Sequence, residues 1–162
     1  MAIAKQRDGG FSLVELILVI IILSTIAAVG SQMLSSGFNA YFSGRDLIDA
    51  EWQGRYAMQR ISRELRDVRS ATSGDLVMSS SQITFTDNSA NVITYALSGN
   101  TLTRNTLPLA DGVTSLSFYY IQADGSTTAT SAADVMYISV DIAINLNNSS
   151  YSLRNTLHPR RF

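Results

Sequence analysis

The sequence predicts an α+β fold in which a long N-terminal helix packs on a C-terminal antiparallel β-sheet head. Residues 11–29 are almost entirely apolar, residues 31–70 mix regularly spaced apolar residues with many charges, and residues 71–162 are rich in Ser, Thr and Asn. A chain of 162 residues accommodates one membrane helix and one small domain. A head of about ninety residues in antiparallel strands does not easily bury its sheet alone, so we expect the helix to cover one side of it.

The segment from Phe11 to Val29 contains 19 residues, and Glu15 is its only charged residue. At about 1.5 Å per residue a helix of this length spans roughly 28 Å, close to the ~30 Å of bilayer hydrocarbon. The segment lacks a polar face, which disfavours a buried helix of a soluble protein. A carboxylate at mid-membrane costs about 2.5–3.5 kcal/mol on insertion scales, and less near an end of the span. Glu15 is therefore expected to have a partner.

Charges on either side of the apolar span predict its orientation. Lys5 and Arg7 lie shortly before the span, and the first charge after it is Arg45. The positive-inside tendency then places the N-terminus in the cytoplasm and the C-terminal bulk on the other side of the membrane.

The candidate processing site, Gly9–Gly10, lies before the apolar span, whereas a secretory signal peptide is cut after its apolar core. Cutting here would remove the basic leader and retain the membrane segment. The run from Gly10 to Glu15, GFSLVE, resembles the prepilin leader of type IV pilin-like proteins. The resemblance implies cleavage after Gly10 by a prepilin peptidase, methylation of the new amine of Phe11, and pairing of Glu15 with the N-terminal amine of a neighbouring subunit. An ordinary signal anchor with an incidental glutamate is the alternative.

The resulting division of the chain has four parts: a leader over residues 1–10, a transmembrane helix over 11–30, an amphipathic helix over 31–70 and a β-rich head over 71–162. Gly30, Gly37, Gly44 and Gly54 are the expected places for bending in the helix. Its predicted apolar face comprises Leu34, Phe38, Tyr41, Ile48, Trp52, Ile61, Leu65 and Val68. Its predicted ion pairs four residues apart are Arg45–Asp49, Glu51–Arg55, Arg60–Glu64 and Arg63–Asp67. These charges form either a solvated face or contacts with neighbouring subunits.

Short β-rich runs separated by turn residues predict the strands of the head. A compact turn at residues 97–100 suggests a hairpin, another turn is expected at 87–89, and the small polar stretch 122–134 is expected to be a flexible loop. The predicted strands are Asp75–Met78, Gln82–Thr86, Asn91–Leu97, Thr101–Arg104, Val113–Ile121, Val135–Leu146 and Tyr151–Leu157.

The resemblance extends beyond the leader. Residues 54–66, the runs 83–86, 93–95 and 102–104, and the segments 113–120 and 153–156 are similar to W-type minor pilins and to J-type minor pseudopilins of type II secretion. Many major pilins carry a helix-kinking proline where this chain has Gln32, and many close a C-terminal loop with a disulfide, whereas this chain has no cysteine. A pilin-like fold and a minor rather than major subunit are therefore implied. Pilus and secretion pseudopilus remain alternatives.

Two functions follow as hypotheses. In the first, the protein is a low-copy subunit that helps initiate assembly of a type IV pilus or a type II secretion pseudopilus. In the second, it is a filament-tip adhesin or a minor pilin that binds a ligand or DNA. The expected partners are the prepilin peptidase, other major and minor subunits, and lipid of the bacterial inner membrane. The head would lie in the periplasm or outside the cell.

Composition disfavours nucleic acid as a partner. The net charge is −1, and removal of residues 1–10 takes away two positive charges and one negative charge, which leaves about −2. The tail residues Arg154, Arg160 and Arg161 form a basic end, for which solubility or contact with DNA or an acidic partner are the alternatives.

The sequence does not favour an enzyme, and we predict no catalytic residue, cofactor or metal site. His158 is the only histidine, and neither a phosphate-binding glycine loop nor a zinc-protease motif occurs. Asp111, Asp124 and Asp134 lie in expected loops and provide the oxygen ligands that Ca²⁺ prefers. Isolated loop aspartates are more often solvated turn formers, which is the favoured interpretation here.

Overall fold

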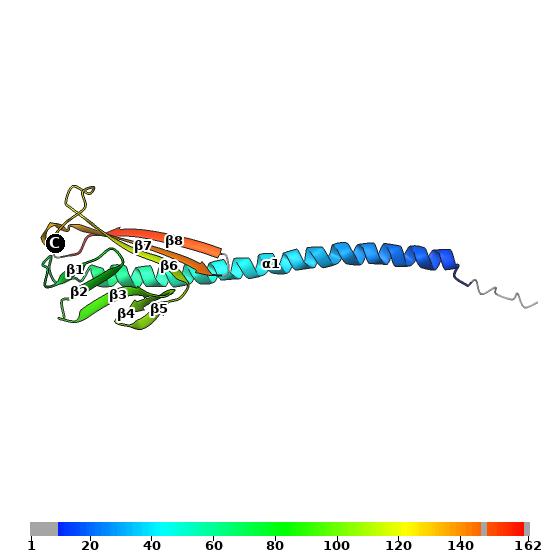
Figure 1. Ribbon diagram of the computed structural model, residues 1–162, viewed down its shortest axis with the longest axis horizontal. Coiled ribbons are helices and arrows are strands. Elements are labelled where there is room, and N and C mark those ends of the chain that lie inside the picture. The colour runs from blue at the N-terminus through cyan, green and yellow to red at the C-terminus, as the bar shows by residue number, and fades with distance from the viewer. Residues whose placement is uncertain (1–9, 147–148, 161–162) are drawn as a thin grey trace, which may run out of the picture. The chain divides into compact units, whose positions relative to one another are not determined.

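The computed structural model describes residues 10–146 and 149–160, and the chain divides into two compact units between Phe42 and Ser43. Within the first unit, the described residues comprise Gly10–Ser12 and the first part of helix α1. The second unit contains the rest of α1 and all of the strands (Figure 1). The predicted α+β fold, with an N-terminal helix packed on antiparallel sheets, is confirmed.

Helix α1 extends from Leu13 to Leu65 without interruption at any of its four glycines. It ends before the expected limit of Ser70, and Arg66 still donates its backbone N–H to the Ser62 carbonyl at 3.3 Å. Val68 then forms an isolated antiparallel bridge with Asp87. The chain thus leaves the helix through a short turn and enters the first sheet.

The strands form two antiparallel sheets. The first has the order β1-β2-β3-β4-β5, and the second has the order β6-β7-β8. A one-turn 3₁₀ helix, Ala132–Asp134, precedes β7. The strand bounds are β1 Leu76–Met78, β2 Gln82–Thr86, β3 Val92–Ser98, β4 Thr101–Arg104, β5 Leu107–Ala110, β6 Val113–Ile121, β7 Tyr137–Leu146 and β8 Ser149–Leu157.

Strand β5 is the element that the sequence did not predict. Pro108 lies in its centre and lacks a backbone N–H, which is typical of a loop rather than a strand. Here β5 pairs with β4 alone, at the edge of the sheet, which is where proline is tolerated in a strand. The predicted turn between Ala96 and Leu102 is confirmed, with Gly99 in the left-handed region at φ 59°.

The part of α1 that belongs to the second unit packs against both sheets through small residues. Ala50, Ala57, Ile61 and Leu65 are fully buried. A Cβ added at Gly54 would lie 3.2 Å from Leu153 Cδ1 and 3.3 Å from Ile144 Cδ1, so this glycine permits a close approach of α1 to β7 and β8. On the other side of the helix, the side-chain oxygen of Gln53 accepts the backbone N–H of Asp111 at 2.7 Å.

The predicted apolar face of α1 is wrong for most of its length: Leu34, Phe38 and Tyr41 in the first unit are exposed, and so are Ile48 and Trp52 in the second. Ile48 and Trp52 have exposed fractions of 55% and 70%, whereas Ile61 is fully buried. Trp52 and Ile61 are nine residues apart, which at about 100° per residue places them on opposite sides of the helix. The face toward the sheets carries Ala50, Gly54 and Ala57 instead, because larger residues would hold the helix away from them.

The two sheets meet along β6. Phe118 donates its backbone N–H to Ser80 at 2.9 Å, and Val113 donates to Asn100 at 2.8 Å, so β6 contacts the turns of the first sheet. The Tyr120 hydroxyl donates to the Ser79 carbonyl at 3.0 Å and accepts the Ser79 N–H at 3.1 Å. Burial raises the pKa of Tyr120 to about 12, which keeps this hydroxyl protonated as a donor.

The stretch 122–134, expected to be a flexible loop, has its own internal bonds. Asp124 accepts the backbone N–H groups of Ser126 at 3.0 Å and Thr127 at 2.9 Å, which closes a turn. These bonds and that of the Thr127 hydroxyl hold the pKa of Asp124 well below its usual range. Ala129 and Ala132 are buried. Small residues in a stretch whose composition is typical of a loop therefore contribute to the core.

A polar cluster around Glu64 links α1 to the first sheet. Glu64 accepts hydrogen bonds from the Tyr95 hydroxyl at 2.7 Å, from Arg104 Nε at 2.8 Å and from Arg60 Nε at 3.2 Å. The Glu64 side chain is only 16% exposed. The pairs Arg45–Asp49, Glu51–Arg55 and Arg60–Glu64 form as expected, but Arg63 and Asp67 do not pair, since Asp67 accepts from the Asn88 amide instead.

The pKa of Glu64 reflects two opposing influences. Burial acts to raise the pKa, but the bonds from Arg104, Tyr95 and Arg60 outweigh it and leave the pKa below 4.5. Because the folded pKa is below the unfolded value, the cluster stabilises the fold fully above about pH 4.5. This contribution is lost as the pH falls through the folded pKa.

We expect Glu64→Gln to lower the free energy of unfolding by about 2–3 kcal/mol at pH 7, because it leaves Arg104 without its anionic partner in a half-buried site. Thermal melting of the full chain in detergent, followed by circular dichroism, measures the effect. The matched control is Glu51→Gln, whose exposed pair with Arg55 is worth less than about 1 kcal/mol. A melting difference that does not shrink at all as the pH is lowered below 4.5 would contradict the assignment.

Candidate functional site

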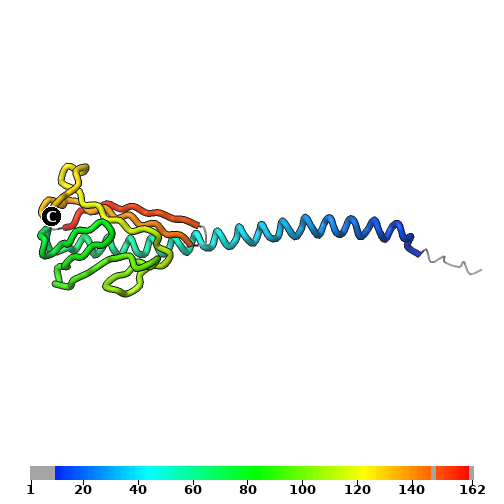
Figure 2. The backbone as a smooth tube through the Cα atoms, in the orientation of Figure 1, coloured from blue at the N-terminus to red at the C-terminus, as the bar shows by residue number. Residues whose placement is uncertain are grey.

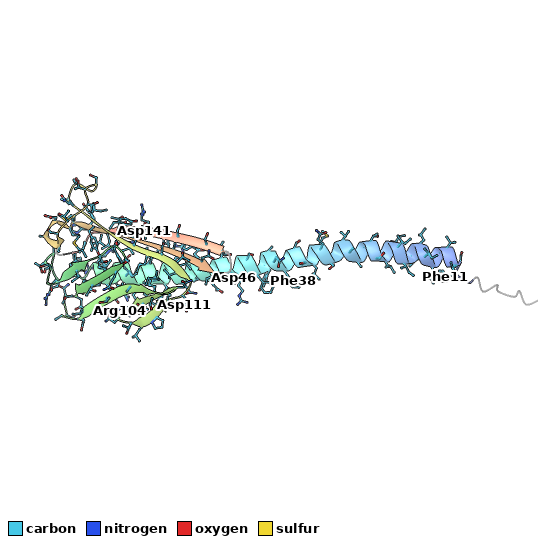
Figure 3. All side chains as sticks on the ribbon, in the orientation of Figure 1. Phe11, Phe38, Asp46, Arg104, Asp111 and Asp141 are labelled. Atoms are coloured by element: carbon cyan, nitrogen blue, oxygen red, sulfur yellow. The ribbon has the colours of Figure 1, made fainter. Side chains whose placement is uncertain are left out.

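The residues that the leader motif singles out lie at the start of α1. Gly10 and Phe11 precede the helix and are exposed; Phe11, labelled in Figure 3, has an exposed fraction of 83%. The helix begins at Leu13, and the Ser12 carbonyl accepts the backbone N–H of Leu16 at 3.2 Å. Gly9 and the rest of the expected leader lie outside the described residues. The Gly10–Phe11 peptide bond is thus exposed at the helix N-terminus.

Glu15 lies in the first turn of α1 and is exposed. It makes no ion pair within residues 10–146 and 149–160. The N-terminus of a helix carries a partial positive charge, which favours a carboxylate there and disfavours an ammonium group. An amine created at Phe11 would therefore gain from a carboxylate close by.

The helix surface that follows Glu15 is apolar on every side. One stretch of this helix has a mean hydropathy of 2.7, and no residue of that stretch is buried within the described residues. Ser24 and Thr25 satisfy their hydroxyls by donating to the carbonyls of Ile21 and Ile22, at 2.9 and 2.8 Å. With these polar groups bonded inside the helix, the segment meets the conditions for crossing a bilayer.

Exposed apolar surface continues beyond this span, still within the first unit. Met33, Leu34 and Phe38 are exposed by 72%, 64% and 55%. Phe38 and Phe42 stack at a centroid distance of 6.5 Å, and Tyr41 contacts Phe42 edge-on at 5.7 Å (Phe38 is labelled in Figure 3). Large side chains of this kind left in water would favour association.

The three aspartates considered as Ca²⁺ ligands are not brought together. Asp111 accepts from Thr101 at 2.9 Å, Asp124 from its own turn, and Asp134 from Ser131 at 2.7 Å. Across residues 10–146 and 149–160 the structure contains no group of three His, Cys, Asp or Glu residues placed to hold a metal ion. His158 is exposed and contacts Tyr137 edge-on at 5.5 Å.

The basic residues of the tail are separated. Arg154 pairs with Asp141 of β7 and lies over the Tyr119 ring at 5.7 Å. Arg160 donates its backbone N–H to the Arg66 carbonyl at 3.1 Å, beyond the end of α1, and Arg161 lies outside the described residues. The sequence did not predict that Arg160 joins Arg63 and Arg66, because nothing local indicates where the tail returns.

Comparison with known protein families gives one match. Residues 5–31 match the model of the prokaryotic N-terminal methylation motif. No curated protein and no solved structure matches the chain. The motif contains Gly10, Phe11 and Glu15 together with the apolar span described above.

The matched motif stands at the start of a helix that is long and apolar enough to cross a membrane, and antiparallel sheets pack on a later part of the same helix. The match at residues 5–31 supports a type IV pilin-like protein, a pilin or a pseudopilin.

Proposed function

We propose that this protein is a minor pilin or pseudopilin that helps initiate assembly of a type IV pilus or of a type II secretion pseudopilus. The observation that carries the proposal is the exposed apolar surface of α1 between Leu13 and Phe42, which joins a membrane span to further unburied aromatic residues. A bilayer covers one helix length of about 30 Å, and neighbouring helices of a filament would cover the rest. Gln32 and the absence of cysteine favour a minor subunit.

The assembly step follows from charge at the start of α1. Cleavage after Gly10 creates an ammonium group at Phe11, at the helix end where positive charge is disfavoured. The Glu15 carboxylate of a neighbouring subunit would offset this charge, and the amine would offset the cost of Glu15 in lipid. Apolar packing between Leu13 and Val29 supplies the main contact, and the ion pair selects one register. The leader, span, helix and head over residues 1–10, 11–30, 31–70 and 71–162 are the parts of this proposal, with the N-terminus in the cytoplasm.

Replacement of Gly10 by valine is expected to block processing, because a branched side chain next to the cut obstructs the peptidase. Intact mass and N-terminal sequencing of the membrane-extracted protein from its host measure this. The wild-type chain should begin at Phe11 and be heavier by one methyl group, whereas Gly10→Val should retain Met1. Gly30→Val, at a helix position with open space around its Cα, is the control that should be processed normally. A wild-type chain that begins at Met1 would refute the proposal.

Glu15→Ala is expected to leave cleavage intact but to reduce incorporation into filaments. The physical reason is that the Phe11 amine of the next subunit loses its partner in lipid. Pull-down with other subunits, compared with the intact mass of the same sample, separates the two steps. Glu51→Ala removes an equal charge from the exposed pair with Arg55 and should incorporate normally. Equal recovery of Glu15→Ala and wild type would rule out this role for Glu15.

A second function, a tip subunit that binds a ligand or surface, is distinguished by counting filaments. Loss of an initiating subunit should remove nearly all surface filaments or overproduced pseudopili seen by electron microscopy, since the first layer is never formed. Loss of a binding subunit should leave the filament count unchanged and abolish attachment. A normal number of filaments in the deletion strain would therefore contradict the initiating function and favour the binding function.

A further inference from the structure

The unpaired arginines of the described chain gather in one place. Within residues 10–146 and 149–160, six arginines form ion pairs and three do not. Those three are Arg63, Arg66 and Arg160, and all three are exposed. They line the same groove, with a volume of about 680 Å³, in the second unit of the chain. We call it the arginine groove; Arg55 also borders it, and Trp52 and Leu153 form its apolar side.

The positions of these arginines are fixed by the fold rather than by sequence proximity. Arg63 lies in the last turn of α1, and Arg66 directly follows the helix. Arg160 is held beside them because its N–H donates to the Arg66 carbonyl at 3.1 Å, where the chain end returns to α1 (Figure 2). The partial negative charge at the helix C-terminus offsets some of the repulsion among the three guanidinium groups.

Acidic residues do not neutralise the groove. The residues that line it include four arginines and no Asp or Glu. Arg63, Arg66 and Arg160 also line a neighbouring hollow of about 280 Å³, whose acidic residues are Glu64, Asp67 and Asp87. These carboxylates accept hydrogen bonds from other groups: Glu64 from Tyr95, Arg104 and Arg60, Asp67 from Asn88, and Asp87 from Asn91. A chain with a net charge of −1 thus presents one locally positive groove.

The groove is also partly apolar, which limits the occupants that fit it. Trp52 is 70% exposed at its edge, and Leu153 is half-buried within it. At its floor the Asn155 amide donates to the Ser62 hydroxyl at 2.8 Å. Guanidinium groups beside an exposed indole suit carboxylates placed next to an apolar side chain.

We propose that the arginine groove is a docking site for an acidic peptide segment of a partner protein, with two or three carboxylates flanking an apolar residue. The carboxylates would pair with Arg63, Arg66 and Arg160, and the apolar residue would lie between Trp52 and Leu153. This role concerns the second unit of the chain alone and does not depend on processing at Gly10 or on assembly through Glu15.

Trp52 makes the proposal directly measurable, because it is the only tryptophan of the chain. The probe is a fluorescein-labelled hexapeptide of glutamate with a central leucine pair, added to the full-length protein in detergent micelles. We expect saturable anisotropy, a simultaneous change in Trp52 emission, and affinity that falls as salt rises. The same peptide with glutamine in place of glutamate should bind at least about tenfold more weakly.

Substitutions at the groove complete the test. Arg63→Gln, Arg66→Gln and Arg160→Gln should each weaken binding about three- to fivefold, as expected for exposed ion pairs, and the triple variant should abolish it. Arg45→Gln, which removes the same charge from an exposed site outside the groove, is the matched control. Circular dichroism verifies that each variant is folded, and Arg63→Lys combined with Arg66→Lys should retain part of the affinity.

Four outcomes would overturn the inference: unchanged affinity in the triple variant, equal binding of the neutral peptide, no saturable binding of the acidic peptide, or binding of a short single-stranded DNA oligonucleotide with much higher affinity than the peptide. The last result would assign the groove to nucleic acid. Each leaves the proposed filament role intact, because wild-type processing and filament number are measured separately.

Discussion

The head depends on the close approach of one helix to two sheets. In the second unit α1 is the only long helix among the described residues, so it has to fill the core on both of its flanks. Ala50, Gly54 and Ala57 allow the β7 and β8 side chains to reach the helix backbone, and Glu64 fixes its other flank to Tyr95 and Arg104. The bulky residues displaced from these positions, Ile48 and Trp52, are consequently exposed. The same constraint thus determines both what is buried and what the head presents to a partner.

Much of the architecture could be predicted from local pattern. The apolar span and its single carboxylate are contiguous, so composition alone indicates a membrane helix, and alternating β-rich runs with strong turns locate most of the strands. Strand β5 could not be predicted because proline is unfavourable in strands. Pro108 is tolerated here only because β5 lies at the edge of the sheet. The predicted apolar face of α1 is wrong at Trp52 because Trp52 and Ile61 are nine residues apart, which places them on opposite sides of the helix.

The candidate sites also differ in how far the sequence alone predicts them. Gly10, Phe11 and Glu15 lie in one short run of sequence, so they can be chosen from the sequence alone, and the matched residues 5–31 include all three. The arginine groove combines a helix end with a chain end almost a hundred residues later, and only the backbone bond between Arg160 and Arg66 brings them together. Ion-pair geometry adds what sequence does not show: Arg60 and Arg104 share one carboxylate, whereas Arg63 is left without an acidic partner in the described residues.

These features assign different physical interactions to the two units of the chain. The first unit exposes apolar side chains and one carboxylate, so its proposed association would be governed by lipid and by packing between helices, with little dependence on salt. The second unit contains the buried core, and its arginines outside the arginine groove are paired, so the proposed docking at the groove would be electrostatic and screened by salt. If both proposals hold, the first unit would join a filament while the second binds and releases a partner. Exchange of the partner at the arginine groove would then need no change in the contacts that hold the first unit.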